Sequence, residues 1–182
     1  MSFYNKFFAS LVFSLVVTSL FFTHSNANSA LITNICNGAD DFQYCHNLFF
    51  LDPRSVTVDV HGLALITVQT TIIKIQDTFD TKISDLVRNI TDPVGKHRIG
   101  VCQSHYTDAA TKYTNIFQST DKKAYQDAID GLRIGSYDVV NCQNVYRRKD
   151  LIAESPISAE NIEIAIKLTR VILIVIEYLI RN

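Results

Sequence analysis

The stretch that decides the fold is Leu65–Ile90, LITVQTTIIKIQDTFDTKISDLVRNI. Large apolar residues recur in it every three or four positions, at Leu65, Val68, Ile72, Ile75, Phe79, Ile83, Leu86 and Ile90. Apolar residues with this spacing lie along one face of an α-helix. The pattern predicts one long amphipathic helix that begins near Thr57 and ends at the breaker sequence Thr91–Gly95.

Two further amphipathic stretches follow this helix. The second covers residues 99–116 and is predicted to end at residues 118–121, while the third covers about residues 122–146. The third carries Gly131 and Gly135 in its middle, where each glycine costs about 1 kcal/mol relative to alanine. Either close packing against a neighbouring helix or a local kink would account for these glycines.

A fourth helix is expected from Ser158, a favourable N-cap residue, to Ile180. Within it, Val171–Ile176 is apolar on every side, and its β-branched residues by themselves favour a strand. The surrounding helical spacing and the charges of Lys167 and Glu177 instead favour a buried bundle helix, and they disfavour a membrane span.

Four long helices joined by short connections predict an all-α, up-down-up-down four-helix bundle over residues 57–182. The whole chain has only 6 Gly and 3 Pro, which agrees with long uninterrupted helices. Residues 28–56 form a segment too long for a loop. Because Leu31–Cys36 and Phe42–Leu48 each resemble a short helix, we expect an N-terminal helical hairpin there.

The first 27 residues have the features of a secretory signal peptide. A lysine-bearing start precedes an apolar run, Phe7–Phe22, and a small-residue cleavage site ends at Ala27. The apolar run is shorter than the roughly 20 residues that a membrane span requires. We therefore expect residues 1–27 to be removed, the mature protein to be secreted, and no membrane anchor to remain after cleavage.

The four cysteines, Cys36, Cys45, Cys102 and Cys142, are expected to form disulfides in an oxidising compartment, where three pairings are possible. Sequential pairing is favoured because each pair then joins neighbouring segments. Cys102 lies early in the second predicted helix and Cys142 late in the third, so an antiparallel arrangement brings them side by side. The spacings match neither a zinc site nor a Cys-x-x-Cys redox motif.

The sequence contains no recognisable catalytic, cofactor or nucleic-acid-binding motif. A net charge of −1 lacks the basic excess of a nucleic-acid-binding protein. His105 and Asp108 are spaced to share a helix face, but a metal site needs three or four ligands, so we interpret the pair as a solvated helix surface. We expect no catalytic residue, no metal and no cofactor. The sequon Asn89-Ile90-Thr91 makes Asn89 a candidate for glycosylation.

The chain resembles the plant invertase and pectin methylesterase inhibitor family over essentially its whole mature length. The resemblance rests on Leu31-Ile32 before Cys36, Tyr44-Cys45, Asp52–Ser55, Asp59 through Leu65-Ile66, Cys102-x-x-x-Tyr106-x-x-Ala109, Cys142, and Ser155-Pro156 with Asn161. Within the family, the chain is most similar to the group of invertase inhibitors that includes the plane-tree pollen allergen, notably over Tyr44–Ile73.

The resemblance implies a four-helix bundle with a helical hairpin, and disulfides that join the first cysteine to the second and the third to the fourth. It also implies inhibition. Family members bind one-to-one to an acid invertase or to a pectin methylesterase in the apoplast or vacuole, and they cover its active site.

The candidate partner-binding residues are Asp121, Lys122, Lys123 and Tyr125. Cell-wall invertase inhibitors of the family carry a Pro-Lys-Phe motif in the turn between the second and third bundle helices, and this turn enters the invertase active site. At the matching positions here, Lys123 keeps the lysine, whereas Lys122 and Ala124 replace the proline and the phenylalanine. Tyr125 supplies an aromatic ring one residue later, or else packs in the core.

Three functions are compatible with these features. The preferred one is inhibition of a plant acid invertase, of the cell wall or of the vacuole. The alternative is inhibition of pectin methylesterase through a face of the bundle, although Leu168–Leu173 departs from the Ser-Asn-Ala-Leu-type segment of that branch. The second alternative is a non-inhibitory secreted helical protein that binds an apolar ligand or another cell-wall partner.

Overall fold

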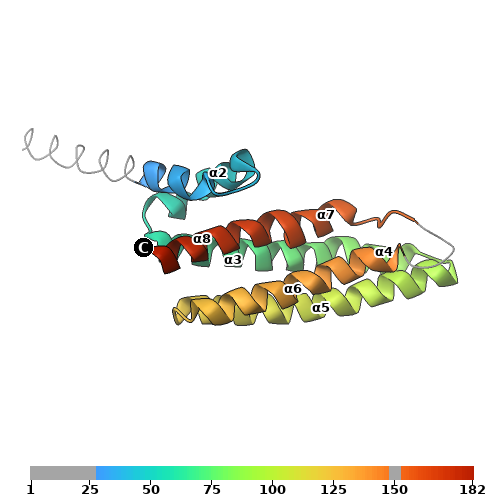
Figure 1. Ribbon diagram of the computed structural model, residues 1–182. Coiled ribbons are helices and arrows are strands. Elements are labelled where there is room, and N and C mark those ends of the chain that lie inside the picture. Colours follow the sequence, from blue (N-terminus) through green and yellow to red (C-terminus); the bar gives the residue numbers. More distant parts are fainter. Residues whose placement is uncertain (1–27, 148–152) are drawn as a thin grey trace, which may run out of the picture.

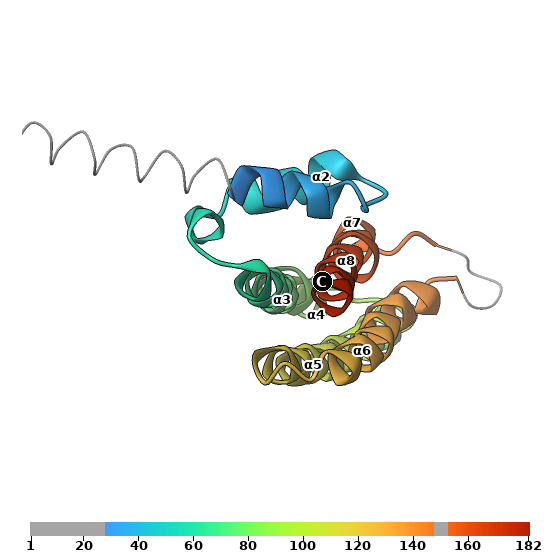
Figure 2. The same ribbon diagram turned by 60° about the vertical axis from the view of Figure 1, so that its left-hand side comes forward.

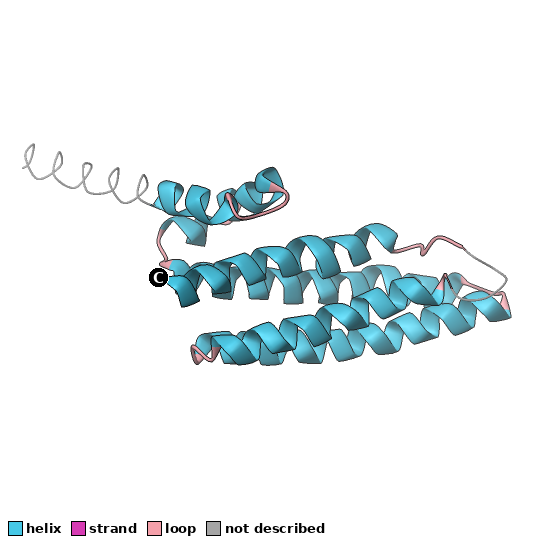
Figure 3. Ribbon diagram, viewed as in Figure 1, coloured by secondary structure: helices cyan, strands magenta, loops and turns pink. Residues whose placement is uncertain are grey.

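The computed structural model describes residues 28–147 and 153–182, so the predicted signal peptide lies outside the described residues. All regular structure in these two ranges is helical, without a strand, which confirms the all-α prediction (Figure 3). Within the same ranges, none of the helices combines the length and the apolar character that crossing a bilayer requires.

The first bundle helix is continuous over the predicted stripe. It consists of α3 (Val60–Asp77), a π-helical turn η2 (Thr78–Ile83) and α4 (Ser84–Asn89). The helix begins at Val60, slightly later than the predicted Thr57, because the Asp59 carboxylate caps it by accepting a hydrogen bond from the Gly62 backbone N–H at 2.9 Å.

The second bundle helix, α5 (Pro93–Asp121), is longer than predicted. Asp92 caps it by accepting a hydrogen bond from the Gly95 N–H at 2.7 Å, and Pro93 occupies its first turn, where no donor is needed. These residues do more than break the first helix, which is all that their sequence indicated. They end one helix and start the next, which adds almost two turns to α5.

The third bundle helix, α6 (Tyr125–Val145), packs closely against α5. A Cβ atom at Gly131 would lie 2.8 Å from Ile116 Cγ1, and one at Gly135 would lie 3.0 Å from Tyr113 Cε2. Both separations are shorter than van der Waals contact. Close helix packing, rather than a kink, therefore explains the two glycines.

The fourth bundle helix comprises α7 (Ser158–Ile162), a π-helical turn η3 (Glu163–Leu168) and α8 (Thr169–Arg181). The prediction that Ser158 is the N-cap is wrong, because Ser158 is already helical and its hydroxyl accepts a hydrogen bond from Gln143 Nε2 at 3.2 Å. The predicted burial of α8 is confirmed, with Val171, Ile172, Ile174, Val175 and Ile176 in the core.

The four long helices form an up-down-up-down bundle, as predicted. In both views α3 lies beside α8 and α5 beside α6 (Figures 1 and 2). The hairpin consists of helical residues 28–36 and α2 (Phe42–Phe50), followed by a 3-10 turn, η1 (Pro53–Val56). It lies over α8, on the opposite side of the bundle from α5 and α6 (Figure 2).

Two disulfides join the pairs that were favoured from sequence. Cys36–Cys45 closes the hairpin, and Cys102–Cys142 links α5 to α6. The hairpin also contacts the fourth helix through charged groups: Lys167 Nζ lies 3.0 Å from Asp41 Oδ2, and the Tyr44 hydroxyl donates to Glu163 Oε1 at 3.4 Å.

Candidate functional site

The turn between α5 and α6 is held in a left-handed conformation by its own backbone. Lys123 N–H donates to Thr120 O at 2.9 Å, and Ala124 N–H donates to Ser119 O at 2.8 Å. This pair of bonds is a Schellman motif, which places the residue at C′ in the left-handed region. That residue is Lys123, with φ of 59°. It is the only non-glycine residue with positive φ in the described part of the chain.

The left-handed conformation is unusual for lysine. Glycine normally occupies C′, because any Cβ there crowds the following carbonyl at a cost of about 1–2 kcal/mol. Strain of this kind concentrates at functional sites. Lys123 is thus a candidate on backbone geometry as well as on its position in the sequence.

Asp121, Lys122 and Lys123 are exposed at the tip of this turn. Neither lysine forms a salt bridge with any other residue of the described ranges. The tip therefore presents two adjacent ammonium groups to solvent, on a backbone that is fixed by hydrogen bonds.

Tyr125 anchors the turn to the first bundle helix. Its hydroxyl lies 3.2 Å from His61 Nδ1, and the two rings meet edge to face with their centroids 6.2 Å apart. Burial, and then the negative charge of Asp59, raise the pKa of the Tyr125 phenol. Tyr125 is partly buried and positions the turn, so it is less available than the two lysines for direct contact with a partner.

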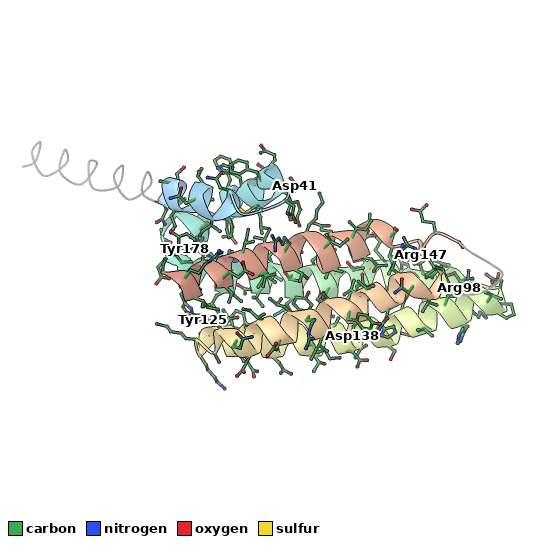
Figure 4. All side chains as sticks on the ribbon, viewed as in Figure 1. Asp41, Arg98, Tyr125, Asp138, Arg147 and Tyr178 are labelled. Carbon is green, nitrogen blue, oxygen red and sulfur yellow. A yellow bond between two sulfur atoms is a disulfide. The ribbon has the colours of Figure 1, made fainter. Side chains whose placement is uncertain are left out.

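His61 and Asp59 were not predicted to belong near this turn. They lie more than sixty residues before Tyr125 in the chain and come close to it only because α3 begins at the end of the bundle where α5 gives way to α6 (Figures 1 and 4). Figure 4 shows Tyr125 at that same end, below Tyr178 of α8.

A buried polar network lies nearer the other end of the bundle. The Tyr106 hydroxyl donates to Asn161 Oδ1 at 2.8 Å, and Asn161 Nδ2 donates to Gln143 Oε1 at 2.8 Å. Burial, assisted by the charge of Glu160, raises the pKa of Tyr106, so its hydroxyl stays a donor at ordinary pH. The network joins α5, α6 and α7 beside the Cys102–Cys142 disulfide.

The chain aligns with known plant inhibitors over most of its length. It is 31% identical over 147 residues to "Cell wall / vacuolar inhibitor of fructosidase 2" of Arabidopsis thaliana, covering 77% of this chain and 81% of that protein. This chain belongs to the plant invertase and pectin methylesterase inhibitor family. No family model matches the chain.

Other members of the inhibitor family support the same assignment. The chain is 29% identical over 150 residues to "Pectinesterase inhibitor 5" of Arabidopsis thaliana, covering 82% of this chain and 83% of that one. It is 27% identical over 121 residues to the "Putative invertase inhibitor" of Platanus orientalis, covering 66% of this chain and 70% of the other. The family resemblance seen in the sequence, including its plane-tree member, is confirmed.

The fold is also that of a solved inhibitor. A crystal structure of a mutant form of a pectin methylesterase inhibitor from Arabidopsis superposes with a TM-score of 0.66, at 17% identity, covering 80% of this chain and 95% of that one. At this identity the match shows the fold alone. The family assignment through its inhibitor relatives makes this protein an inhibitor and not an enzyme.

The motif residues of the inhibitor family fall into two structural groups. Tyr106 and Asn161, which carried part of the resemblance, meet in the buried network and serve the fold. Lys123, which keeps the motif lysine, lies at the exposed tip beside Lys122, which stands in place of the motif proline. Asn89, the glycosylation candidate, is exposed at the last residue of α4.

Proposed function

We propose that this protein inhibits a plant acid invertase by one-to-one binding, with the α5–α6 turn inserted into the active site of the enzyme. The observation that carries the proposal is the exposed left-handed Lys123 beside Lys122. Glycoside hydrolases act through a pair of carboxyl groups that flank the scissile bond. Two ammonium groups on a fixed turn are complementary to such a cleft in charge, and charge complementarity gives specificity and speed of association.

The rest of the molecule supports the turn mechanically. The bundle ends at the turn, Tyr125 fixes it to His61, and the two disulfides limit the motion of the hairpin and of the α5–α6 pair. A binding surface that is already ordered loses less entropy on association. Asp121 lies at the last residue of α5, and we propose that it forms part of the same contact surface.

The test is a parallel titration of the disulfide-bonded protein against a plant acid invertase and a plant pectin methylesterase. Stoichiometric loss of invertase activity is expected. Lys123→Gly should weaken that inhibition at least tenfold, because glycine keeps the left-handed turn and removes only the ammonium side chain. Lys96→Ala is the matched control, since Lys96 is exposed near the opposite end of α5. Equal inhibition by Lys123→Gly and the unchanged protein would overturn the role of the turn.

Inhibition of pectin methylesterase is the second candidate, and the similarity to "Pectinesterase inhibitor 5" favours it. Its contact surface would lie on the bundle face. Ile162 and Ile166 lie one helical turn apart there, with 46% and 60% of their surfaces exposed. In that case Ile166→Glu should abolish inhibition of the esterase and Lys123→Gly should leave it unchanged, the reverse of the pattern expected for invertase.

We also propose that the protein is secreted after removal of residues 1–27 and acts in the cell wall or the vacuole. The support is the apolar N-terminal run and the name of its relative, a cell wall / vacuolar inhibitor. Sequencing the N-terminus of the protein recovered from plant tissue tests the cleavage, and a mature chain that still begins at Met1 would contradict it.

A further inference from the structure

Three metal-ligating side chains meet where α5 packs against α6. His105 and Asp108 lie on one face of α5, and Asp138 comes from the facing side of α6. One ligand atom from each lies within 4.8 Å of the other two. Figure 4 places Asp138 part-way along the α5–α6 pair, between Tyr125 and Arg147. Only His105 and Asp108 could be paired from the sequence, and the packing of α6 against α5 adds Asp138 as the third candidate ligand.

Some polar atoms of these three side chains have a hydrogen-bond partner and others do not. Asp138 is a buried carboxylate with 9% of its surface exposed, and its Oδ2 accepts from Lys112 Nζ at 2.7 Å. Its other oxygen, Oδ1, lies 3.6 Å from His105 Nδ1, which is too long for a hydrogen bond. His105 Nδ1 is buried and has no hydrogen-bond partner among the described residues.

A buried nitrogen without a hydrogen-bond partner calls for an explanation, and a bound ion is one of the recognised explanations. Here that nitrogen lies 3.6 Å from Asp138 Oδ1, and a carboxylate oxygen of the exposed Asp108 lies within 4.8 Å of one ligand atom from each of these two residues. Imidazole and carboxylate are both ligands of Zn²⁺. The convergence therefore points to a cation.

We propose that His105, Asp108 and Asp138 bind a divalent metal ion of the Zn²⁺ class, with water as the remaining ligand. In a tetrahedral site the ligand atoms lie about 2.1 Å from Zn²⁺ and hence about 3.4 Å from one another. The separation of 3.6 Å between His105 Nδ1 and Asp138 Oδ1 is already close to this value. The outer carboxylate, Asp108, closes the site by a side-chain rotation at the surface.

The charges around the site act on its affinity for a cation in opposite directions. Two carboxylates attract a divalent ion, and the Lys112 ammonium on Asp138 opposes it. Removing that ammonium should therefore strengthen binding. This sign distinguishes a site at Asp138 from weak adsorption of metal to exposed histidines elsewhere.

A bound ion would connect α5 to α6 at a second point besides the Cys102–Cys142 disulfide. Asp138 lies thirteen residues after Tyr125 on α6, a distance of about 20 Å along the helix. The metal is thus separate from the proposed inhibitory turn, and its binding does not depend on which enzyme is inhibited. It is expected to raise the melting temperature of the protein.

The test is calorimetric titration of chelator-treated, disulfide-bonded protein with ZnCl₂, together with the absorption spectrum in CoCl₂. One equivalent of ion should bind with a rise in melting temperature. Asp108→Asn and His105→Ala should each weaken binding at least tenfold, and Lys112→Met should strengthen it severalfold. Asp108 is exposed, so its substitution should leave the metal-free melting temperature unchanged.

The control variants are His97→Ala and Asp127→Asn, exposed residues of the same two helices, and both should bind like the unchanged protein. Three results would overturn the proposal. They are no one-to-one binding up to millimolar Zn²⁺, equal loss of binding in His97→Ala and His105→Ala, and unchanged affinity in Lys112→Met.

Discussion

Replacing Tyr106 by phenylalanine removes one oxygen atom from the centre of the bundle. Tyr106 is completely buried and Asn161 is 2% exposed, so neither group has water to replace the lost bond. Asn161 Oδ1 loses the donor that now lies 2.8 Å away. Leaving a buried acceptor unpaired costs about 1–3 kcal/mol. We therefore expect Tyr106→Phe to lower the free energy of unfolding by about 2 kcal/mol.

Urea unfolding with the disulfides intact measures this loss, because a lower midpoint at an unchanged slope reports stability alone. The melting temperature should fall by about 4–8 °C, since 1 kcal/mol corresponds to about 2–4 °C in a domain of this size. Tyr137→Phe makes the same chemical change at a side chain that is 63% exposed, and it should alter stability by less than about 0.5 kcal/mol.

The network also predicts how two substitutions combine. In a protein that already carries Asn161→Leu, Tyr106→Phe leaves no acceptor unpaired. It should therefore lower the free energy of unfolding by much less than it does in the unchanged protein. Equal effects of Tyr106→Phe and Tyr137→Phe, or strict additivity in the double variant, would refute the reasoning that this buried hydrogen bond stabilises the fold.

Three other predictions concern packing, charge and strain. Gly131→Ala should destabilise the protein by about 1–3 kcal/mol, because its Cβ would lie 2.8 Å from an α5 side chain. Gly100→Ala should stabilise it by about 0.5–1 kcal/mol, because a Cβ there has nothing within 4 Å. Thermal unfolding measures both changes. A backbone N–H of α2 and then Lys167 lower the pKa of Asp41, so its contribution to hairpin docking is present above about pH 4 and is lost as the pH falls through the lowered value. Below about pH 4, the backbone amides of the hairpin should therefore exchange faster relative to their intrinsic exchange rate at the same pH. Asp41→Asn should show weaker protection of these amides already at pH 6. Lys123→Gly should leave the melting temperature unchanged or raise it, because the relieved strain of about 1–2 kcal/mol exceeds the added entropy of the unfolded chain, about 0.4–1 kcal/mol; a clear drop would contradict the assignment of strain.

The four helices could be predicted because burial on one face imposes a repeat that is visible in the sequence. Val68, Ile75 and Ile83 of the first stripe are completely buried, as their spacing requires. Leu65 is only partly buried, and Leu63 occupies the core instead. The stripe identifies the helix, but its rotation is set by how the other helices pack against it.

The two π-helical turns could not be predicted from apolar spacing, because one extra residue in a turn still leaves steps of three or four. Each is followed by a hydroxyl residue that donates to the carbonyl five residues earlier: Ser84 to Phe79 at 3.0 Å, and Thr169 to Ile164 at 2.8 Å. These side chains satisfy backbone acceptors at the widened turn.

The residues around the candidate sites likewise include some that could be predicted from the sequence and others that could not. Lys122 and Lys123 could be selected from the sequence because they align with the Pro-Lys-Phe turn motif of the family that the chain resembles. His61 reaches Tyr125, and Asp138 reaches His105, only through tertiary packing between helices. Periodicity predicts that two helices exist and not which polar residues on them face each other, so neither contact had a signal in the sequence.

At position 123, the residue that best suits the fold differs from the residue that the proposed function requires. Both hydrogen bonds of the turn come from backbone groups, so glycine would satisfy every structural demand of this position with less strain. Tyr106 and Asn161 show the opposite case, in which the side chains themselves make the structural contacts. The Lys123 side chain, by contrast, is exposed and forms no salt bridge within the described residues, so the fold gains no ion pair from it. We propose that its role lies in binding a partner, because an acidic cleft that receives an ammonium group is complementary to it in charge.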